Sequence, residues 1–452
     1  MNPLELFRDV VSSVPAYRDF LDNNGVDATA VRAMADFEQL PIVTKDNYLR
    51  RYPLPDRCRD GRLDSCDMIA VSSGSSGEPT IWPRSVADEL AVTRRFEQVF
   101  VDSFAAQQRH TLAVVCFPLG TWVGGLFTLA CVRHLAATGL RITAVAPGNN
   151  VAEILRVVPE LGGFVDQVVL LGYPPFIKQV VDAGIRVGLD WSRYAIKLVL
   201  AGEVFSEDWR DLVSRRAGMA DVETGSASLY GTADAGVLGN ETPLSVRIRR
   251  FLASRPELAG ELFGDQRLPT LVQYDPQIRY FETGGDGTLV FSGDSGVPLI
   301  RYGIGDRGGI ISFSDMMAYC REHGFAPEAG PELPFVYVFG RALFAVSYYG
   351  ANVYAENIAN GLEQPAVSDW VTGRFVLETR EDADRNRELW VTVELARGEA
   401  ASPERASAAA QSILTRLCGL NSEFANYVPD DRQLPHVELR PADDPDYFPV
   451  GV

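Results

Sequence analysis

The sequence predicts an α/β fold in which a large N-terminal domain of parallel-rich βαβ sheets, with an antiparallel subregion, precedes a small α+β domain. Three observations support this prediction. Strand-like and helix-like segments alternate between residues 111 and 201, Gly- and Asp-rich turns separate short β segments between 221 and 310, and helix-like and strand-like segments both occur after residue 340. A strand–helix–strand rhythm is typical of a parallel sheet covered by helices.

The first part of the chain, to about residue 65, is predicted to be helical and polar, with Thr44 capping a helix that starts at Lys45. A Gly- and Ser-rich loop then separates short strands at 67–71 and 80–82, and an amphipathic helix follows over 85–104. The alternating part is predicted to contain strands at 111–117, 141–146, 165–171 and 195–201, and helices at 125–137, 151–161 and 176–183.

The chain changes in character after Asp221. Repeated glycines and aspartates predict turns between antiparallel strands that end near 297–310, and the prolines of 331–334 make that segment a candidate linker. The last part is predicted to contain a helix at 352–362, strands at 374–378 and 389–395, and a helix at 402–418. The predicted domains are therefore residues 1–338 and 339–452.

Composition restricts the class of protein. The 452 residues are 46% hydrophobic and 23% charged, as expected for a globular protein, and no apolar run is long enough for a membrane span. A net charge of −18 argues against nucleic-acid and anionic-membrane partners. The six cysteines form no C-x-x-C pair and the four histidines are scattered, which favours reduced thiols over a metal cluster. With no secretory leader at the N-terminus, a cytoplasmic location is expected.

The loop over residues 71–79 is the most distinctive stretch of the sequence. It contains two glycines and four serines, so its backbone can approach a ligand closely and its N–H and hydroxyl groups can bind an anion. We interpret it as a phosphate-binding loop, with a plain surface loop as the alternative. It matches neither G-x-x-x-x-G-K-[ST] nor G-x-G-x-x-G, because Gly74 and Gly77 are too close together and Glu78 stands where a lysine would.

Six phrases, taken together, resemble the adenylate-forming enzymes, and the first of them is typical of the phenylacetate–CoA ligase branch. They occur in the expected order and cover nearly the whole chain, although each is weak alone. The phrases are LPIVTK (40–45), SSGSSGEP (72–79), AGEVFS (201–206), YGTAD (230–234), PLIRYGIGD (298–306), and GR followed by GANVY (340–354).

This resemblance implies an ATP-dependent ligase with a mobile C-terminal domain. A carboxylate, expected to be small and aromatic, would attack the α-phosphate of ATP to give an acyl-adenylate, and coenzyme A would then displace AMP. Mg²⁺ is the implied metal. An amine, a carrier-protein thiol, or nitrite activation leading to an N–N bond are alternatives within the same fold. A degenerate nucleotide-binding protein is the alternative of another class, and homodimerisation stays open.

The resemblance also implies site residues. Asp306 would accept hydrogen bonds from the ribose hydroxyls, and Tyr230 would stack on adenine. Asp234 would bind Mg²⁺, although it is one methylene shorter than the family's glutamate, and Glu241 is a second acidic candidate. Arg341 would contact ribose or phosphate. The remaining nucleotide candidates are Ser73, Gly74, Ser75, Ser76, Gly77, Ala201, Gly202, Glu203, Gly231 and Thr232.

The acid is expected beside the segment 117–125. Glycines there, Gly120 and Gly125, would leave room for the acid, and Phe117 and Trp122 would supply flat apolar walls. A strand end with ordinary core aromatics is the alternative interpretation.

Three features depart from the family pattern. Glu78 replaces a basic residue, and Ala342–Ala345 lacks the polar and acidic residues of the family's hinge. The family also has a lysine near its C-terminus that serves adenylation. In this sequence that lysine is expected within a few residues of the end at Val452, and it is not present in the residues given. If the enzyme lacks it, the first half-reaction is expected to be severely slowed.

Overall fold

The computed structural model describes residues 2–64, 66–72, 80–265, 267–328, 330–341 and 345–448. The chain divides into two compact units. The first comprises Met1–Ser72, Ile81–Gly172 and Gln179–Ala342, and the second comprises Ser73–Thr80, Tyr173–Lys178 and Leu343–Val452. The mixed α/β architecture confirms the predicted fold class.

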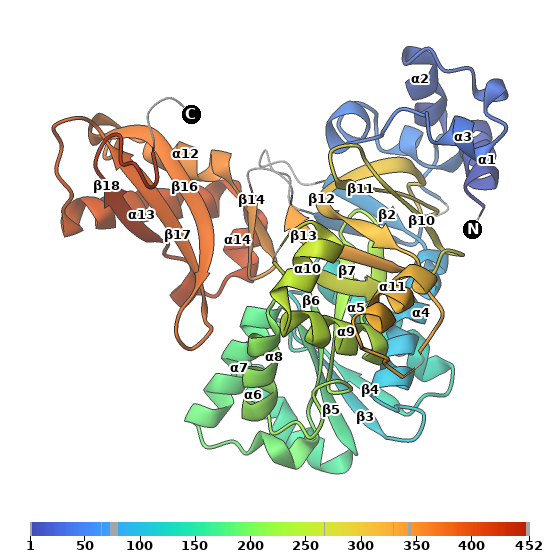
Figure 1. The fold of residues 1–452 in the computed structure, drawn as a ribbon, viewed down its shortest axis with the longest axis horizontal. Helices are drawn as coiled ribbons and strands as arrows, with labels where there is room; N and C mark the ends of the chain where they lie inside the picture. The colour runs from blue at the N-terminus through green and yellow to red at the C-terminus, as the bar shows by residue number, and fades with distance from the viewer. Residues whose placement is uncertain are drawn as a thin grey trace. The chain divides into compact units, whose positions relative to one another are not determined.

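The first unit is built on one sheet of eleven strands, in the order β10-β11-β12-β13-β9-β8-β7-β6-β5-β3-β4. Its parallel part pairs five strands, of which β3 and β5 are buried throughout, whereas the edge strand β4 is partly exposed. Figure 1 shows α6 and α8 on one side of this part and α4 and α5 on the other. The elements are β3 (Thr111–Val115), β4 (Ile142–Val145), β5 (Gln167–Gly172), β6 (Lys197–Ala201), β7 (Ser226–Thr232), α4 (Val86–Gln98), α5 (Val123–Ala137), α6 (Val151–Leu161), α7 (Pro174–Arg186) and α8 (Glu207–Arg216).

The antiparallel strands continue the same sheet. They are β8 (Gly236–Asn240), β9 (Thr270–Gln273), β10 (Arg279–Thr283), β11 (Thr288–Gly293), β12 (Leu299–Ile311) and β13 (Phe335–Arg341). The prediction for residues 331–334 was wrong, because this segment leads into β13 and lies inside the first unit.

Two helices, α9 (Pro243–Ala253) and α10 (Pro256–Phe263), interrupt the region that the sequence predicted to contain turns and strands. A third helix, α11 (Phe313–Glu322), follows that region. Thr242 caps α9 and Pro243 occupies its first turn. Leu244, Ile248 and Leu252 recur at helical spacing and are buried in a cluster with residues of α10 and α11.

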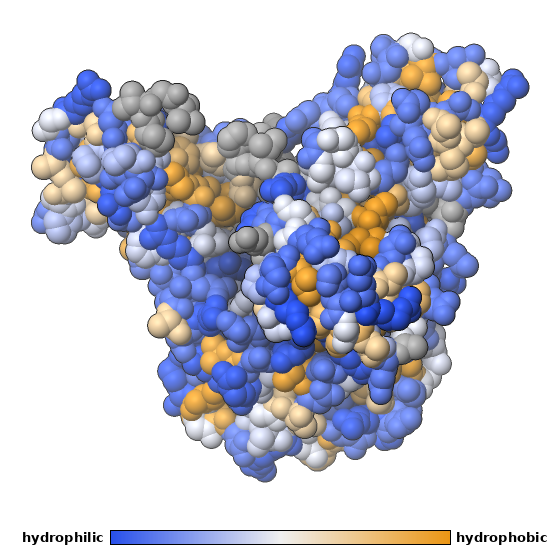
Figure 2. Space-filling view, in the orientation of Figure 1, coloured by the Kyte–Doolittle hydropathy of each residue, from blue (hydrophilic) through white to orange (hydrophobic). Residues whose placement is uncertain are grey.

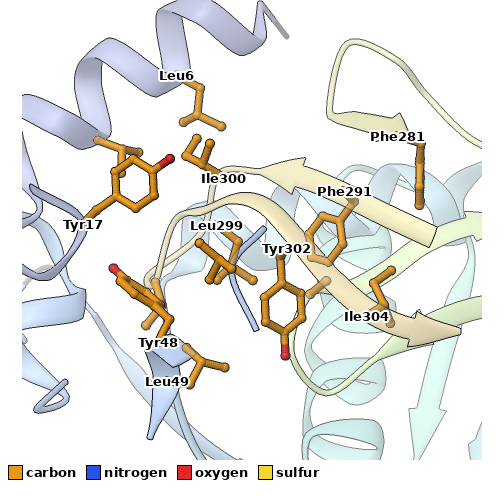
Figure 3. Close-up of a cluster of buried hydrophobic side chains, with 14 of the residues drawn as sticks. Leu6, Tyr17, Tyr48, Leu49, Phe281, Phe291, Leu299, Ile300, Tyr302 and Ile304 are labelled. Atoms are coloured by element: carbon orange, nitrogen blue, oxygen red, sulfur yellow. The ribbon is translucent and has the colours of Figure 1, made fainter. Parts of the chain in front are cut away.

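The N-terminal segment contains α1 (Pro3–Ser13), α2 (Pro15–Asn23), the short α3 (Met34–Phe37) and a π-helical turn over Lys45–Leu49. Its apolar side chains are buried in one cluster with β10, β11 and β12. In Figure 3, Leu6, Tyr17 and Tyr48 face Leu299 and Ile300 of β12. The segment is therefore amphipathic, and its apolar face anchors it to the antiparallel part of the sheet.

The second unit contains a three-stranded sheet in the order β16-β17-β18 and a two-stranded β14-β15 ribbon. The predicted helix at 352–362 starts later than expected, because residues 351–354 form β15. The elements are β14 (Ala345–Tyr348), β15 (Ala351–Tyr354), α12 (Ala355–Leu362), β16 (Val371–Glu381), β17 (Arg387–Leu395), α13 (Pro403–Leu420), α14 (Ser422–Tyr427) and β18 (His436–Arg440).

The surface view in Figure 2 shows a largely hydrophilic face on which apolar side chains form separate patches. Among the helices of the described residues, none is both long enough and apolar enough to cross a membrane.

Candidate functional site

Two predicted site residues, Tyr230 and Asp306, contact each other. The Tyr230 hydroxyl donates a hydrogen bond to Oδ2 of Asp306 at 2.9 Å, and both side chains are buried. Asp306 lies on β12 and pairs through its backbone with Arg341 of β13. Because β7 and β12 are separated by three strands in the sheet order, this bond requires a strongly curved sheet.

The carboxylate of Asp234 lies in the turn between β7 and β8 and is only 2% exposed. The Tyr302 hydroxyl donates to its Oδ2 at 2.6 Å, and Nζ of Lys45 lies 3.2 Å from its Oδ1. An ammonium and a hydroxyl therefore compensate a buried negative charge.

The two tyrosine–aspartate bonds form a reciprocal pair. Tyr230 and Asp234 belong to the β7–β8 hairpin, whereas Tyr302 and Asp306 belong to β12. In each segment, the tyrosine donates a hydrogen bond to the aspartate of the other segment. The aspartate of each segment, four residues after its tyrosine, accepts a hydrogen bond from the tyrosine of the other. Two of the predicted ligand carboxylates are thereby held on the same pair of segments.

Sequence reasoning missed the role of Lys45, although the residue ends one of the family phrases. The structure explains how the N-terminal segment brings Lys45 to Asp234. The Val43 N–H donates to the Arg301 carbonyl at 3.0 Å, and the Gly303 N–H donates to the Val43 carbonyl at 2.9 Å. Thr44 then caps the turn that begins at Lys45, as predicted, by accepting from the Asn47 N–H.

Arg301 secures the same junction. Its guanidinium donates to the Leu40 carbonyl and to both carboxylate oxygens of Glu282. Its backbone has φ of +47°, a left-handed conformation that is uncommon for a residue with a side chain. The local strain is maintained by contacts that join the N-terminal segment to β12.

The turn that carries Asp234 is tightly closed. The Ala235 N–H donates to Oγ1 of Thr232 at 3.2 Å. A Cβ added to Gly231 would lie 2.6 Å from the Gly236 carbonyl oxygen, so the hairpin requires glycine at this position. Gly231 and Thr232 therefore shape the turn, whatever else they contact.

The predicted phosphate loop itself, with Ser73, Gly74, Ser75, Ser76 and Gly77, lies outside the described residues. Its flanks are β1 (Met68–Ser72) and β2 (Thr80–Arg84), which form a two-stranded ribbon. The Val71 N–H donates to the Thr121 carbonyl at 3.0 Å, and Val71 forms a parallel bridge with Trp122. The strand that enters the loop is thus attached to the segment predicted to bind the acid.

In that segment, Phe117 is buried after β3, whereas Trp122 is half-buried and precedes α5. Gly120 has φ of +90°, which makes a sharp turn possible. A Cβ on Gly125 would lie 2.2 Å from the Pro118 carbonyl oxygen. Gly125 is therefore required for close packing of α5 against the 117–122 segment.

The predicted adenine segment follows β6. Ala201 ends the strand, Gly202 has φ of +86°, and Glu203 is buried. Ser206 then starts α8 by accepting a hydrogen bond from the Trp209 N–H at 3.1 Å. The chain therefore turns sharply between the end of β6 and the beginning of α8.

Glu241 lies in a separate buried network. Its Oε1 pairs with Arg210 at 2.7 Å, and its Oε2 accepts from the Ser228 N–H at 2.7 Å. Both carboxylate oxygens of Glu241 are occupied, and its partner Arg210 is only 1% exposed, so we do not retain Glu241 as a metal candidate. Within the described residues, no group of three or more His, Cys, Asp or Glu side chains could hold a metal ion.

Of the two predicted metal ligands, Asp234 fits Mg²⁺ by its chemistry, because this ion is commonly held by one or two carboxylates together with substrate phosphates and water. The ion would take the place of the Lys45 ammonium, which lies 3.2 Å from Oδ1 and is 29% exposed.

No protein-family model matches the sequence. The chain is 25% identical, over 304 residues, to a phenylacetate–coenzyme A ligase of Thermus thermophilus; the match covers 66% of this chain and 61% of that relative. The chain thus matches less than two thirds of the relative's length.

Solved structures share the fold. The TM-score is 0.66 with 2-hydroxyisobutyryl-CoA ligase in complex with 2-HIB-AMP and CoA, at 16% identity and with 97% of this chain and 84% of that chain covered. It is 0.50 with the amide bond synthetase McbA of Marinactinospora thermotolerans, at 14% identity and with 91% of this chain and 75% of that chain covered.

Proposed function

We propose that the chain is a member of the adenylate-forming superfamily and acts as an ATP-dependent, AMP-forming ligase that activates a small carboxylic acid and transfers its acyl group to coenzyme A. The observation that carries this proposal is the reciprocal pair of tyrosine–aspartate bonds, with Lys45 beside Asp234. The two carboxylates that we propose for the ribose and for a cation lie on one pair of segments, which supports the proposal.

In the first half-reaction, an oxygen of the substrate carboxylate bonds to the α-phosphorus of ATP, and the bond from that phosphorus to the bridging oxygen breaks, releasing pyrophosphate. In the second, the sulfur of coenzyme A bonds to the acyl carbon, its thiol proton is lost, and AMP leaves. Positioning and electrostatic stabilisation supply most of the rate in such transfers.

The residues of this chain have distinct roles in the proposal. Asp306, oriented by Tyr230, accepts hydrogen bonds from the ribose hydroxyls. Ala201, Gly202 and Glu203 form the adenine wall, mainly through their backbone.

Lys45 supplies a cation to the phosphates, where the loop has Glu78 in place of a basic residue. Asp234 would hold Mg²⁺, which when bound spreads the negative charge of the phosphates.

We propose an aromatic or other apolar acid as substrate. Phe117 and Trp122 support this proposal as flat apolar side chains at the end of β3 and the start of α5. Their segment is attached through Val71 to β1, the strand that precedes the predicted phosphate loop in the chain.

Equilibrium binding tests the proposed nucleotide site. Calorimetry should show that the unmodified protein binds ATP in the presence of MgCl₂, and also binds AMP. D306N should weaken both by about 10-fold or more, because a charge-assisted hydrogen bond to the ribose is lost. D22N, at an exposed position on α2, should change neither affinity. Absence of ATP binding by the unmodified protein would refute the proposal.

A further inference from the structure

We propose that Arg84 and Arg279 are positioning residues that fix the Asp234 turn by binding its main-chain carbonyls. This inference rests on the proposed function, because it assigns the two arginines an effect on the carboxylate that would hold Mg²⁺ beside the phosphates of ATP.

The two guanidinium groups bind three successive carbonyls. Nη2 of Arg84 donates to the carbonyls of Ala233 at 2.7 Å and Asp234 at 2.9 Å. Nη2 of Arg279 donates to the carbonyl of Ala235 at 3.2 Å. Arg84 is 1% exposed and Arg279 is 6% exposed, so solvent does not compete for these bonds. The backbone on both sides of Asp234 is therefore held in place.

Both arginines carry a buried positive charge, which a purely structural contact to main-chain carbonyls does not require. Neither forms an ion pair with another residue that the structure describes. Burial lowers the pKa of Arg84. Burial, with the added charge of Arg84, lowers the pKa of Arg279 to about 10. Two like charges are thus buried side by side at a free-energy cost that neutral side chains would avoid. The carboxylate of Asp88 attracts both charges, and the carboxylate of Asp234 attracts that of Arg84.

The bonds from Arg84 also connect the Asp234 turn to the strand β2. Arg84 is the last residue of β2, the strand that follows the predicted phosphate loop. It therefore joins the strand leaving that loop to the turn that carries Asp234. An aspartate has one fewer rotatable bond than the family's glutamate, so the position of its carboxylate depends more directly on the backbone.

A double-mutant cycle tests the inference. R84K keeps the charge, but both bonds come from Nη2 of Arg84, and the lysine side chain is one bond shorter, so its ammonium would not reach the position of Nη2. We expect R84K to weaken binding of ATP with MgCl₂ by about 5- to 10-fold, a coupling typical of residues in one hydrogen-bond network. AMP, which has no β- or γ-phosphate, should bind within about 2-fold of the unmodified protein. In the D234N background, R84K should cause no further loss of ATP affinity.

Two further variants keep the test decisive. R279K should reproduce the same pattern with a smaller effect, because Arg279 donates to only one carbonyl of the turn. R95K is the matched control. Arg95 is also a buried arginine, but it lies on α4 and contacts Asn240 and Asp275. R95K should lower the free energy of unfolding without changing the ratio of ATP to AMP affinity.

Equal losses of ATP and AMP affinity in R84K and R279K would overturn the inference, because they would indicate general damage to the fold. Persistence of the full R84K loss in the D234N background would overturn it as well. If the unmodified protein binds AMP and ATP, these outcomes reject the positioning role alone. If it binds neither, the proposed function fails and the inference fails with it.

Discussion

At the scale of single residues, the pair formed by Lys45 and Asp234 joins a buried carboxylate to a cation of the N-terminal segment. The Asp234 carboxylate is almost fully buried and contacts one ammonium and one hydroxyl. A nucleotide phosphate arriving beside Asp234 would meet the same ammonium. Lys45 therefore compensates a buried charge in the free protein and would offer a cation to ATP.

We expect K45M to weaken ATP binding by about 10-fold or more, because a charge-assisted contact to phosphate is removed. AMP binding should fall less, since AMP lacks the β- and γ-phosphates. Calorimetry with both nucleotides measures the difference. R50M is the matched control, because Arg50 lies on the same segment and pairs with the exposed Asp46. Unchanged ATP affinity in K45M would exclude a phosphate contact.

The two tyrosine hydroxyls should have separable effects. Y230F removes the donor to Asp306 and should weaken ATP and AMP binding alike. Y302F removes the donor to Asp234 and should weaken ATP with MgCl₂ more than AMP. Each should cost about 1–2 kcal/mol of unfolding free energy, because a buried acceptor loses its partner. Chemical denaturation and calorimetry together measure both effects, and identical binding losses in the two variants would contradict the assignment.

Sequence reasoning predicted Asp234, Tyr230 and Asp306 as site residues because each lies in a phrase that resembles the family's. Lys45 and Tyr302 lie in such phrases too, but only the folded chain shows which carboxylate they contact. Arg84 gave no signal at all. Its partners are main-chain carbonyls about 150 residues away, and a carbonyl carries no information about residue type.

At the scale of elements, the start of α5 shows how packing shapes the proposed acid site. We expect G125A to destabilise the protein by about 1–3 kcal/mol, because the added methyl would overlap the Pro118 carbonyl oxygen and force the helix to shift. G163A should have little effect, since a Cβ there meets nothing within 4 Å. Denaturant titration measures both, and equal stability of the two variants would contradict the close packing assigned to Gly125.

Glu207, which lies in the contact between α8 and α9, should make the free energy of unfolding depend on pH. Burial alone would raise the pKa of Glu207, but the Arg210 and Arg249 guanidinium groups outweigh it and lower the pKa from 4.5. A carboxyl with a depressed folded-state pKa contributes stability that is present above about pH 4.5 and is lost as the pH falls. The free energy of unfolding should therefore decrease with falling pH below about pH 4.5.

We therefore expect E207Q to lower the free energy of unfolding at pH 7 by about 3–5 kcal/mol, because it leaves the buried Arg249 without its carboxylate partner. The difference from the unmodified protein should shrink as the pH falls below about 4.5. Denaturant titrations between pH 7 and pH 3 measure this convergence. A difference that stays constant over the range would contradict the assigned charge on Glu207.

Element prediction succeeded where hydrophobic periodicity was strong and failed where turn signals dominated. The helix at 151–161 has the predicted bounds. The helices α9 and α10 were missed because glycines and aspartates on both sides directed the interpretation towards turns, although Leu244, Ile248 and Leu252 have helical spacing. Residues 352–354 were predicted to be part of the helix that follows them, but they belong to β15 and pair with β14.

At the scale of the whole molecule, the sequence predicted both a parallel and an antiparallel region but not their union in one sheet. That union depends on the pairing of β13 with β9, more than sixty residues apart, and on the curvature that brings β7 near β12. Such pairings are set by tertiary packing, which local propensity does not encode. The candidate site exists only because of them.

The proposed adenylation activity can be measured as the exchange of labelled pyrophosphate into ATP, using the full-length gene product and a panel of acids. The panel contains aromatic and aliphatic carboxylic acids and nitrite. We predict exchange that depends on an aromatic or other apolar carboxylic acid and is lost in D306N. Exchange with nitrite alone would indicate N–N chemistry instead. ATP binding without exchange for any acid would contradict the proposed ligase activity and favour a non-catalytic nucleotide-binding protein.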